Sequence, residues 1–343
     1  MSGATAPVVV ITGASSGIGR ETARVYAEKG GRVVLASRSR PALETVAQEC
    51  RALGAEALVV PTDVADEEAV LALAASAVRR FGRIDVWVGN AGVFSYGTFE
   101  ELPADVFRQV VETNLMGQVH GARAVLPHFR RQGSGTLVLV GSLYSRVGSP
   151  GKAPYVTSKW GLLGFAEALR QELRGSGIRV RVVLPATIDT PIYQHAANVT
   201  GRRVRPLPPA SSPARVARAI VRSPSRRRHA VFVGRTQTAV LPVHRYAAPV
   251  FDAAAAWLKE HVELRGEDAA ITTGTLFDPP AAASPATGGW RSRRVRVLAG
   301  AFAAAVASLL VLRPRPAPAG AAVAASGQRK PSIWVRSSAT RTP

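Results

Sequence analysis

Residues 7–19 read PVVVITGASSGIG, an apolar, β-branched run that leads directly into a glycine-rich turn. The run predicts a buried first strand, and the residues after it predict a helix through about Lys29. Gly13 allows a tight turn, Gly17 lets the backbone approach a pyrophosphate, and Gly19 permits close packing of the helix. Phosphates would lie at the helix N-terminus, where free N–H groups and the dipole favour negative charge. The turn therefore predicts a dinucleotide site that includes Gly13, Ser15, Ser16, Gly17, Ile18 and Gly19.

Short apolar runs separated by helical segments continue along the chain. Near-continuous apolar strands between helices predict a parallel sheet covered on both faces. The expected fold is a doubly wound α/β domain of the Rossmann type over residues 1–240, followed by a C-terminal extension. The further predicted strands cover residues 31–38, 55–64, 84–92, 135–142, 178–186 and 229–234. One further predicted helix follows the strand 31–38 and ends at Leu53. The others cover residues 66–80, 103–131 and 155–174.

The sequence YVTSK places Tyr155 and Lys159 one helical turn apart. Alone this pair is only suggestive, because such a spacing arises by chance. Ser142 precedes Tyr155 by thirteen residues, and further motifs lie in order before it. The ordered motifs are residues 12–19, 89–92, Asn114, Ser142 and 155–159. With them, residues 7–235 resemble the short-chain dehydrogenase/reductase family, in the subgroup with a single Rossmann-type domain and the TGxxxGxG and YxxxK motifs.

The resemblance implies interconversion of a carbonyl and an alcohol. Tyr155 would be the acid/base, and because a free tyrosine has a pKa of about 10, the Lys159 ammonium on the same helix face would lower that pKa. Lys159 would also hydrogen-bond the nicotinamide ribose. Ser142 would orient the substrate oxygen, and Asn114, by resemblance, would hold a water linked to Lys159. The structural alternatives are a half-buried helix tyrosine, a serine cap and a structural asparagine.

The cofactor is expected to be NADP rather than NAD. In a dinucleotide fold an acidic residue about twenty positions after the glycine turn binds the ribose 2′-hydroxyl. Here the second strand ends at Ser37 and Arg38, and no Asp or Glu occurs before Glu44. Arg38 could instead pair with a 2′-phosphate, unless it or Arg40 is simply solvated.

The resemblance also assigns further cofactor contacts. Asp63 and Val64 would hold the adenine, and Asn90, Ala91 and Gly92 would line the adenosine ribose. Two motifs depart from the family pattern: Gly89 replaces the first asparagine of Asn-Asn-Ala-Gly, and Ala186 replaces the glycine after Pro185. We expect some loss of local rigidity at Gly89 but no loss of cofactor binding. The expected contacts to the nicotinamide end are Pro185, Ile188 and Thr190.

The loop after Thr190 is where this family places its substrate lid, and Tyr193 and His195 are candidates to line the pocket. The six histidines lack metal-ligand spacing, so no metal site is expected. Cys50 is the only cysteine, which excludes an intramolecular disulfide and predicts a reduced, cytoplasmic compartment.

The net charge of +21 comes mainly from residues 201–343, which hold 23 of the 44 Lys and Arg but only 6 of the 23 Asp and Glu. No basic helix interleaved with aromatics and no nucleic-acid motif accompanies this charge, so a specific nucleic-acid partner is not expected. Attraction to anionic lipid headgroups fits the charge better.

The C-terminal part divides into a helical extension and linker (241–290), a hydrophobic segment (291–315) and a basic tail expected to be disordered (316–343). Residues 297–312 are uncharged, and a helix of sixteen residues spans only about 24 Å of a roughly 30 Å hydrocarbon core. Membrane association through this segment and packing on the protein or a partner both remain open.

The sequence thus predicts an NADP(H)-preferring oxidoreductase for a small-molecule carbonyl or alcohol, with apolar pocket residues favouring a lipophilic substrate. The alternatives are an NAD-dependent alcohol dehydrogenase on the same scaffold and a non-catalytic dinucleotide-binding scaffold protein. Family resemblance adds the expectation of a homo-oligomer.

Overall fold

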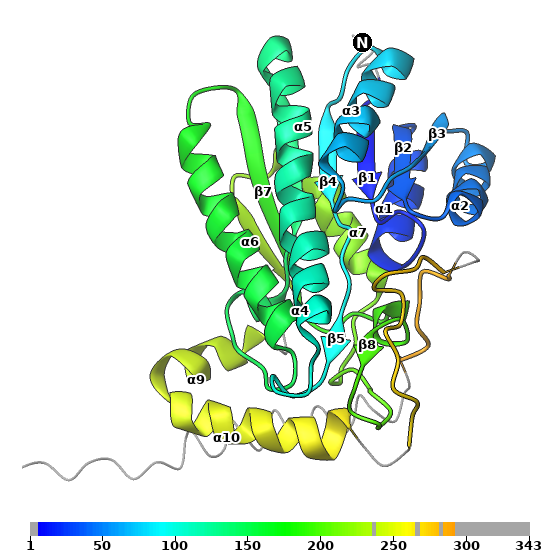
Figure 1. Ribbon diagram of the computed structural model, residues 1–343. Helices are drawn as coiled ribbons and strands as arrows, with labels where there is room; N and C mark the ends of the chain where they lie inside the picture. Colours follow the sequence, from blue (N-terminus) through cyan, green and yellow to red (C-terminus); the bar gives the residue numbers. More distant parts are fainter. Residues whose placement is uncertain (1–5, 235–237, 265–267, 281–283, 292–343) are drawn as a thin grey trace, which may run out of the picture. The chain divides into compact units, whose positions relative to one another are not determined.

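The computed structural model describes residues 6–234, 238–264, 268–280 and 284–291. A sheet of seven parallel strands forms its centre, in the order β3-β2-β1-β4-β6-β7-β9 (Figure 1). The strands are β1 (Val8–Thr12), β2 (Arg32–Ser37), β3 (Ala57–Pro61), β4 (Val86–Gly89), β6 (Gly135–Val140), β7 (Ile178–Pro185) and β9 (Ala230–Val233). All seven predicted strands and the doubly wound fold are confirmed. The strand order reverses between β1 and β4, where such folds place their ligands.

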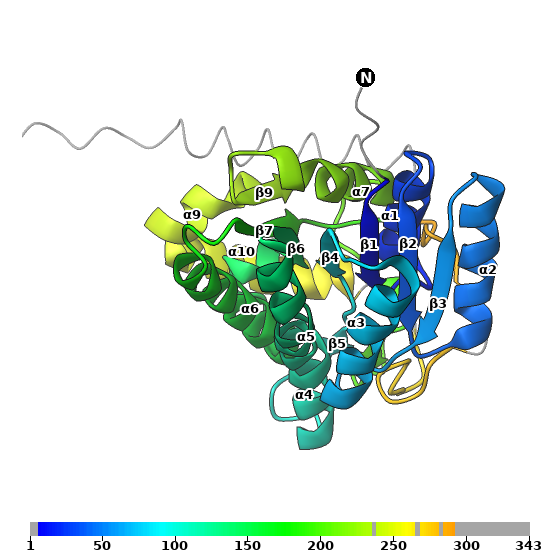
Figure 2. The ribbon, with the colours of Figure 1, turned by 90° about the horizontal axis from the view of Figure 1, so that it is seen from above.

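Helices cover both faces of the sheet. Figure 2 shows α1 and α7 on one side of the strands and α3, α5 and α6 on the other. The first layer consists of α1 (Gly17–Ala27), α2 (Arg40–Ala52) and α7 (Pro213–Arg222). The second layer is formed by α3 (Glu67–Phe81), α5 (Gly117–Gln132) and α6 (Ala153–Glu172).

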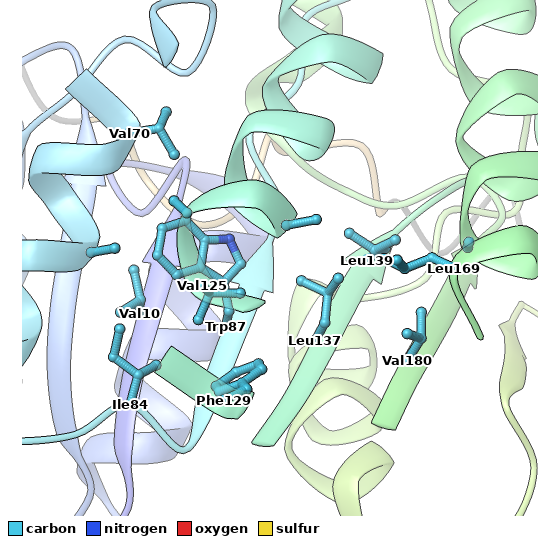
Figure 3. Packing of buried hydrophobic residues seen from close by; sticks show 14 of the residues in the cluster. Val10, Val70, Ile84, Trp87, Val125, Phe129, Leu137, Leu139, Leu169 and Val180 are labelled. Atoms are coloured by element: carbon cyan, nitrogen blue, oxygen red, sulfur yellow. The ribbon is translucent and has the colours of Figure 1, made fainter. Parts of the chain in front are cut away.

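Two buried rings fill the space between the sheet and the second layer, Trp87 from β4 and Phe129 from α5 (Figure 3). Glycine makes room for each. A Cβ at Gly121 would lie 2.7 Å from the Trp87 indole nitrogen, and one at Gly135 would lie 2.2 Å from the Phe129 ring. Close packing of this kind holds β4 and β6, and therefore the residues that follow them, in fixed positions.

The predicted helical region 103–131 contains a π-helical turn. It runs as α4 (Ala104–Val111), a π turn η1 (Glu112–Met116) and α5. Asn114 lies at the centre of this turn and is fully buried. Such turns occur often at functional sites, and no residue pattern announces one here.

Beyond β9 the chain returns to the domain. The helices α9 (Val240–Tyr246) and α10 (Ala248–Leu258) and a π turn η5 (Lys259–Glu263) lie at the same end of the molecule as the small parallel sheet of β5 (Ser95–Tyr96) and β8 (Ala197–Asn198) (Figure 1). Leu264 and Leu276 are buried in a cluster at this end. All the described residues belong to one compact unit.

Residues 297–312, for which the sequence leaves membrane association and packing on the protein or a partner as alternatives, and the basic tail lie outside the described residues, as does most of 291–315. Within the described part of the chain, no helix combines the length and the apolar character needed to cross a membrane.

Candidate active site

The glycine turn and the GNAG motif brace each other across the junction of β1 and β4. The Thr12 hydroxyl accepts hydrogen bonds from the Asn90 and Ala91 N–H groups at 3.0 and 3.1 Å. The Asn90 side-chain amide donates to the carbonyls of Thr12 and Gly13 at 2.9 and 3.2 Å. Gly89 departs from the family pattern, but Asn90, the asparagine that holds the glycine turn, is retained.

The turn is shaped in a way that only glycine permits. Gly13 and Gly17 have φ angles of +66° and +52°, a region that other residues rarely adopt. A Cβ at Gly19 would lie 2.0 Å from the Gly13 carbonyl oxygen. The cradle therefore suits a pyrophosphate above the N-terminus of α1, and its residues fit a bound dinucleotide.

The residues predicted for the adenine, Asp63 and Val64, follow β3, and Arg38, predicted for the ribose 2′-phosphate, follows β2. Asp63 uses one carboxylate oxygen to accept the Ala65 N–H at 3.0 Å. Val64 is buried, and its carbonyl contacts His120 Nδ1 at 3.0 Å. Arg38 is half-buried, and its guanidinium donates to backbone carbonyls of a C-terminal stretch.

Three of the four predicted catalytic side chains lie together. Ser142 follows β6, while Tyr155 and Lys159 lie on the first turns of α6, and all three are buried. The Ser142 side chain is close enough to Tyr155 to lower the pKa of its hydroxyl, and the Ser142 oxygen accepts the Tyr144 N–H at 3.2 Å. Ser142 is therefore both the cap of a short helical turn and a partner of Tyr155.

Burial controls the titration of this group. It lowers the pKa of Lys159 to about 8, and it raises the pKa of Tyr155 above its ordinary value, while the Ser142 side chain acts on the Tyr155 pKa in the opposite direction. Lys159 Nζ donates to the Val140 carbonyl at 3.0 Å and lies 5.5 Å from the centroid of the Tyr155 ring. The Tyr155 pKa is thus raised by burial, whereas the sequence predicted that Lys159 would lower it.

Asn114 ties two parts of the site together. Its side-chain oxygen accepts the Val93 N–H at 2.7 Å, and its side-chain nitrogen donates to the Val93 carbonyl and the Ser158 hydroxyl at 3.0 and 3.2 Å. These bonds join the loop after β4 to α6. A Cβ at Gly92 would lie 3.2 Å from Asn114 Oδ1 and 3.8 Å from Lys159 Nζ, so Gly92 leaves the space beside both open.

The residues predicted for the nicotinamide end follow β7. Pro185 ends that strand, Ile188 is buried, and Thr190 faces the glycine turn, because a Cβ at Gly17 would lie 3.3 Å from the Thr190 side chain. Thr190 also precedes the short helical turn η3 (Pro191–Tyr193). The glycine turn and the segment after β7 are far apart in sequence but adjacent in the structure.

An aromatic cluster surrounds Tyr155. The Phe94 ring centroid lies 4.2 Å from that of Tyr155, and Tyr144 lies 6.2 Å from it in an edge-on arrangement. Tyr193, a predicted pocket residue, lies 5.9 Å from Phe94. His195 instead contacts the Ser284 hydroxyl through Nε2 at 3.3 Å, and burial lowers its pKa.

Lys152 and Glu263 form a buried ion pair beside this cluster, which sequence reasoning missed. Lys152 Nζ also donates to the Ser149 hydroxyl at 2.9 Å and lies 5.2 Å from the Tyr96 ring centroid. Burial lowers the pKa of Lys152 and raises that of Glu263, and each partner opposes the shift of the other. Among the residues of this cluster that sequence reasoning missed, only Tyr144 could have been found from the sequence, through its position two residues after Ser142. Phe94, Lys152 and Glu263 come together only through tertiary contacts.

No group of three or more His, Cys, Asp or Glu side chains that could hold a metal occurs among the residues that the structure describes. The described site itself holds a buried hydroxyl pair, a buried lysine and a glycine-lined phosphate cradle.

Comparison with known proteins agrees with this geometry. Residues 7–199 match the family model described as short chain dehydrogenase. An uncharacterized oxidoreductase of Bacillus subtilis, YxnA, is 41% identical over 192 residues. That match covers 55% of this chain and 54% of the relative, so the chain spans about half the length of that protein.

Two solved structures share the fold. An alcohol dehydrogenase from Thermococcus sibiricus complexed with 5-hydroxy-NADP is 29% identical, with a TM-score of 0.59, and the match covers 66% of this chain and 95% of that one. A short chain dehydrogenase/reductase from Burkholderia phymatum in complex with NAD is 26% identical, with a TM-score of 0.64 and coverage of 72% and 95%. Because the two were solved with different dinucleotides, the likeness does not select between NADP and NAD.

Proposed function

Because this chain belongs to the short-chain dehydrogenase family, we propose that it is an oxidoreductase that interconverts a carbonyl and an alcohol and prefers NADP(H). The observation that carries this function is the buried group of Ser142, Tyr155 and Lys159, in which the Ser142 side chain acts on the Tyr155 hydroxyl and lowers its pKa against the effect of burial. A hydroxyl that positions an oxygen beside a second hydroxyl that can give up a proton is what carbonyl reduction requires.

In the reducing direction a bound nicotinamide supplies the hydride to the carbonyl carbon. Ser142 holds the substrate oxygen against Tyr155, and the Tyr155 hydroxyl gives its proton to that oxygen. The resulting phenolate is stabilised by the Lys159 ammonium near the ring. Asn114 positions α6 relative to the loop after β4, and in this role it keeps Lys159 and Gly92 aligned. Its predicted role as the holder of a water remains part of this proposal.

The dinucleotide would lie along the switch point of the sheet. The cradle of residues 13–19 would hold the pyrophosphate, Asp63 and Val64 the adenine, residues 90–92 the adenosine ribose, and Pro185, Ile188 and Thr190 the nicotinamide. Arg38 carries the preference for NADP(H), since a guanidinium pairs well with a phosphate and no acidic side chain follows it before Glu44.

The substrate is proposed to be lipophilic. Phe94 and Tyr144 lie against the Tyr155 ring, and Tyr193 lies against Phe94. Such aromatic walls bind apolar or aromatic groups. The reacting carbonyl would then be attached to a bulky, weakly polar body.

Oxidation of NADPH and of NADH, followed at 340 nm against a panel of aldehydes and ketones, tests these assignments. We expect turnover with NADPH, a lower kcat/KM with NADH, and higher kcat/KM for bulky apolar carbonyls than for small polar ones. Equal kcat/KM for the two dinucleotides would favour the NAD-dependent alternative and contradict the role of Arg38. Binding of NADPH without turnover of any substrate would favour a scaffold protein.

A further inference from the structure

Two C-terminal stretches, residues 272–280 and 284–290, lie against the proposed dinucleotide site; together we call them the strap. The first stretch meets Arg38. Its guanidinium donates to the backbone carbonyls of Thr275, Leu276 and Phe277 at 2.5, 3.1 and 2.8 Å. The group expected to recognise a 2′-phosphate is therefore surrounded by oxygen acceptors from the chain itself.

The second stretch meets the N-terminus of α1. The Gly17 N–H donates to the Pro285 carbonyl at 3.4 Å, and Arg20 Nη1 donates to the Ser284 carbonyl at 2.7 Å. An N–H group at this position is the kind of donor that a pyrophosphate oxygen uses. The strap thus places a carbonyl oxygen at each of the two points where the dinucleotide would place phosphate oxygens.

The second stretch is anchored beside the nicotinamide end. The Asp189 carboxylate accepts the Gly288 and Trp290 N–H groups at 3.0 and 2.8 Å, and the Trp290 indole donates to the Thr190 carbonyl at 3.2 Å. Gln194 donates to the Gly288 carbonyl at 2.8 Å. The strap is therefore held by defined contacts on both sides of the glycine turn.

The strap is also tied to the proposed substrate lid. The Thr275 N–H donates to the His195 carbonyl at 3.0 Å, and the His195 ring contacts the Ser284 hydroxyl. One lid residue therefore contacts both stretches. Movement of the strap would release the lid segment as well as Arg38 and Gly17.

From these contacts we infer that the strap is an internal competitor of the dinucleotide and a determinant of cofactor specificity. This inference rests on the proposed function of the site. A phosphate is a stronger acceptor for a guanidinium than neutral carbonyls are, because its hydrogen bonds are charge-assisted. NADP(H) can therefore replace the three carbonyls at Arg38 through its 2′-phosphate, whereas NAD(H) has no group that does so. Both dinucleotides must displace Pro285 from Gly17.

Two glycine substitutions in the full-length chain separate these contacts. A Cβ at Gly288 would lie 2.4 Å from the Thr190 carbonyl oxygen, so Gly288→Ala weakens the second stretch. We expect the Kd values of NADPH and NADH to fall together by about fivefold, the factor that one net hydrogen bond represents. Gly164→Ala is the matched control, since its Cβ would meet nothing within 4 Å, and it should leave both Kd values unchanged.

Gly274→Ala tests the contact at Arg38. Gly274 has a φ of +54°, and a Cβ there would lie 2.2 Å from the His195 carbonyl oxygen, so the substitution displaces residues 275–277. Here we expect the Kd of NADPH to fall by about fivefold and that of NADH to change little. The two variants should therefore differ in their effect on the ratio of the two affinities.

Hydrogen exchange of the wild-type protein provides a second test that does not depend on either variant folding. Saturating NADPH should increase amide exchange at residues 284–290, because the dinucleotide displaces this stretch. Slower exchange there, or Kd values that rise or stay constant in both variants, would overturn competition while leaving the proposed function standing. Failure of every form to bind either dinucleotide would overturn the proposed cofactor site and the competition together.

Discussion

Residues 8–190 and residues 241–290 both contribute groups to the candidate active site, but the two regions do so in different ways. The first region supplies it through a repeated pattern, in which each functional residue follows a strand or lies on the helix after it. The second region has no repeating pattern, and it contributes a buried carboxylate, Glu263, together with backbone carbonyls and the Trp290 side chain. Chemistry is thus carried by residue types that a sequence displays, whereas access and packing depend on contacts that form only in three dimensions.

Tyr155→Phe is the strongest test of where the chemistry resides. It removes the proton donor and should lower kcat by about 10³-fold, within the range of general acid catalysis. The Kd of NADPH should change little, as measured by fluorescence titration. Tyr246→Phe is the matched control, because Tyr246 belongs to the second region and is 80% exposed. Retention of full activity by the Tyr155 variant would contradict the mechanism.

Lys152→Met tests how strongly the second region is attached. The substitution leaves Glu263 buried without its partner, which should cost about 3–5 kcal/mol in the free energy of unfolding, measured in urea. Replacing both partners, as Lys152→Met with Glu263→Leu, should recover most of this loss, because no buried charge remains. A single variant as stable as the wild type would show that the ion pair does not hold η5 against the domain.

Most of the first region could be predicted because its signals are local. Apolar runs gave all seven strands of the large sheet, and the positive φ angles of Gly13 and Gly17 follow from the turn that their spacing requires. The adjacency of Ser142, Tyr155 and Lys159 follows from the parallel strand order, which brings the end of β6 beside the start of α6.

The contacts of the second region could not be predicted because they use groups that every residue has. Arg38 donates to three backbone carbonyls, and a backbone carbonyl gives no sign in the sequence. The stretch 278–290 has the Pro, Ala and Gly composition of a linker, yet its described residues bind Asp189 and Thr190. The π turn around Asn114 was not predicted for a similar reason, because a π turn differs from an α-helix in its backbone hydrogen bonds and not in the residue types that form it.

The titration of Lys159 gives a smaller effect that belongs to the first region alone. Its folded-state pKa, about 8, lies below the ordinary value of 10.5, so between these values the unfolded chain binds more protons than the folded one. Its penalty to folding is therefore complete below pH 8 and declines as the pH rises. From pH 7 to pH 9 the wild type should gain free energy of unfolding relative to Lys159→Met, and its reductase activity should fall as the ammonium is lost. A constant difference between the two proteins would contradict this pKa.

The smallest effect is expected at the exposed pair Arg202–Glu260, which also joins the second region to the rest of the domain. Its closest nitrogen and oxygen atoms are 2.9 Å apart, but both side chains are more than a third exposed. Water screens such a pair, so Arg202→Ala should cost less than about 1 kcal/mol in urea unfolding, against several for Lys152→Met. If the two losses were equal, charge alone would attach the second region. A large difference would assign that attachment to burial, since the two ion pairs differ mainly in their exposure to water.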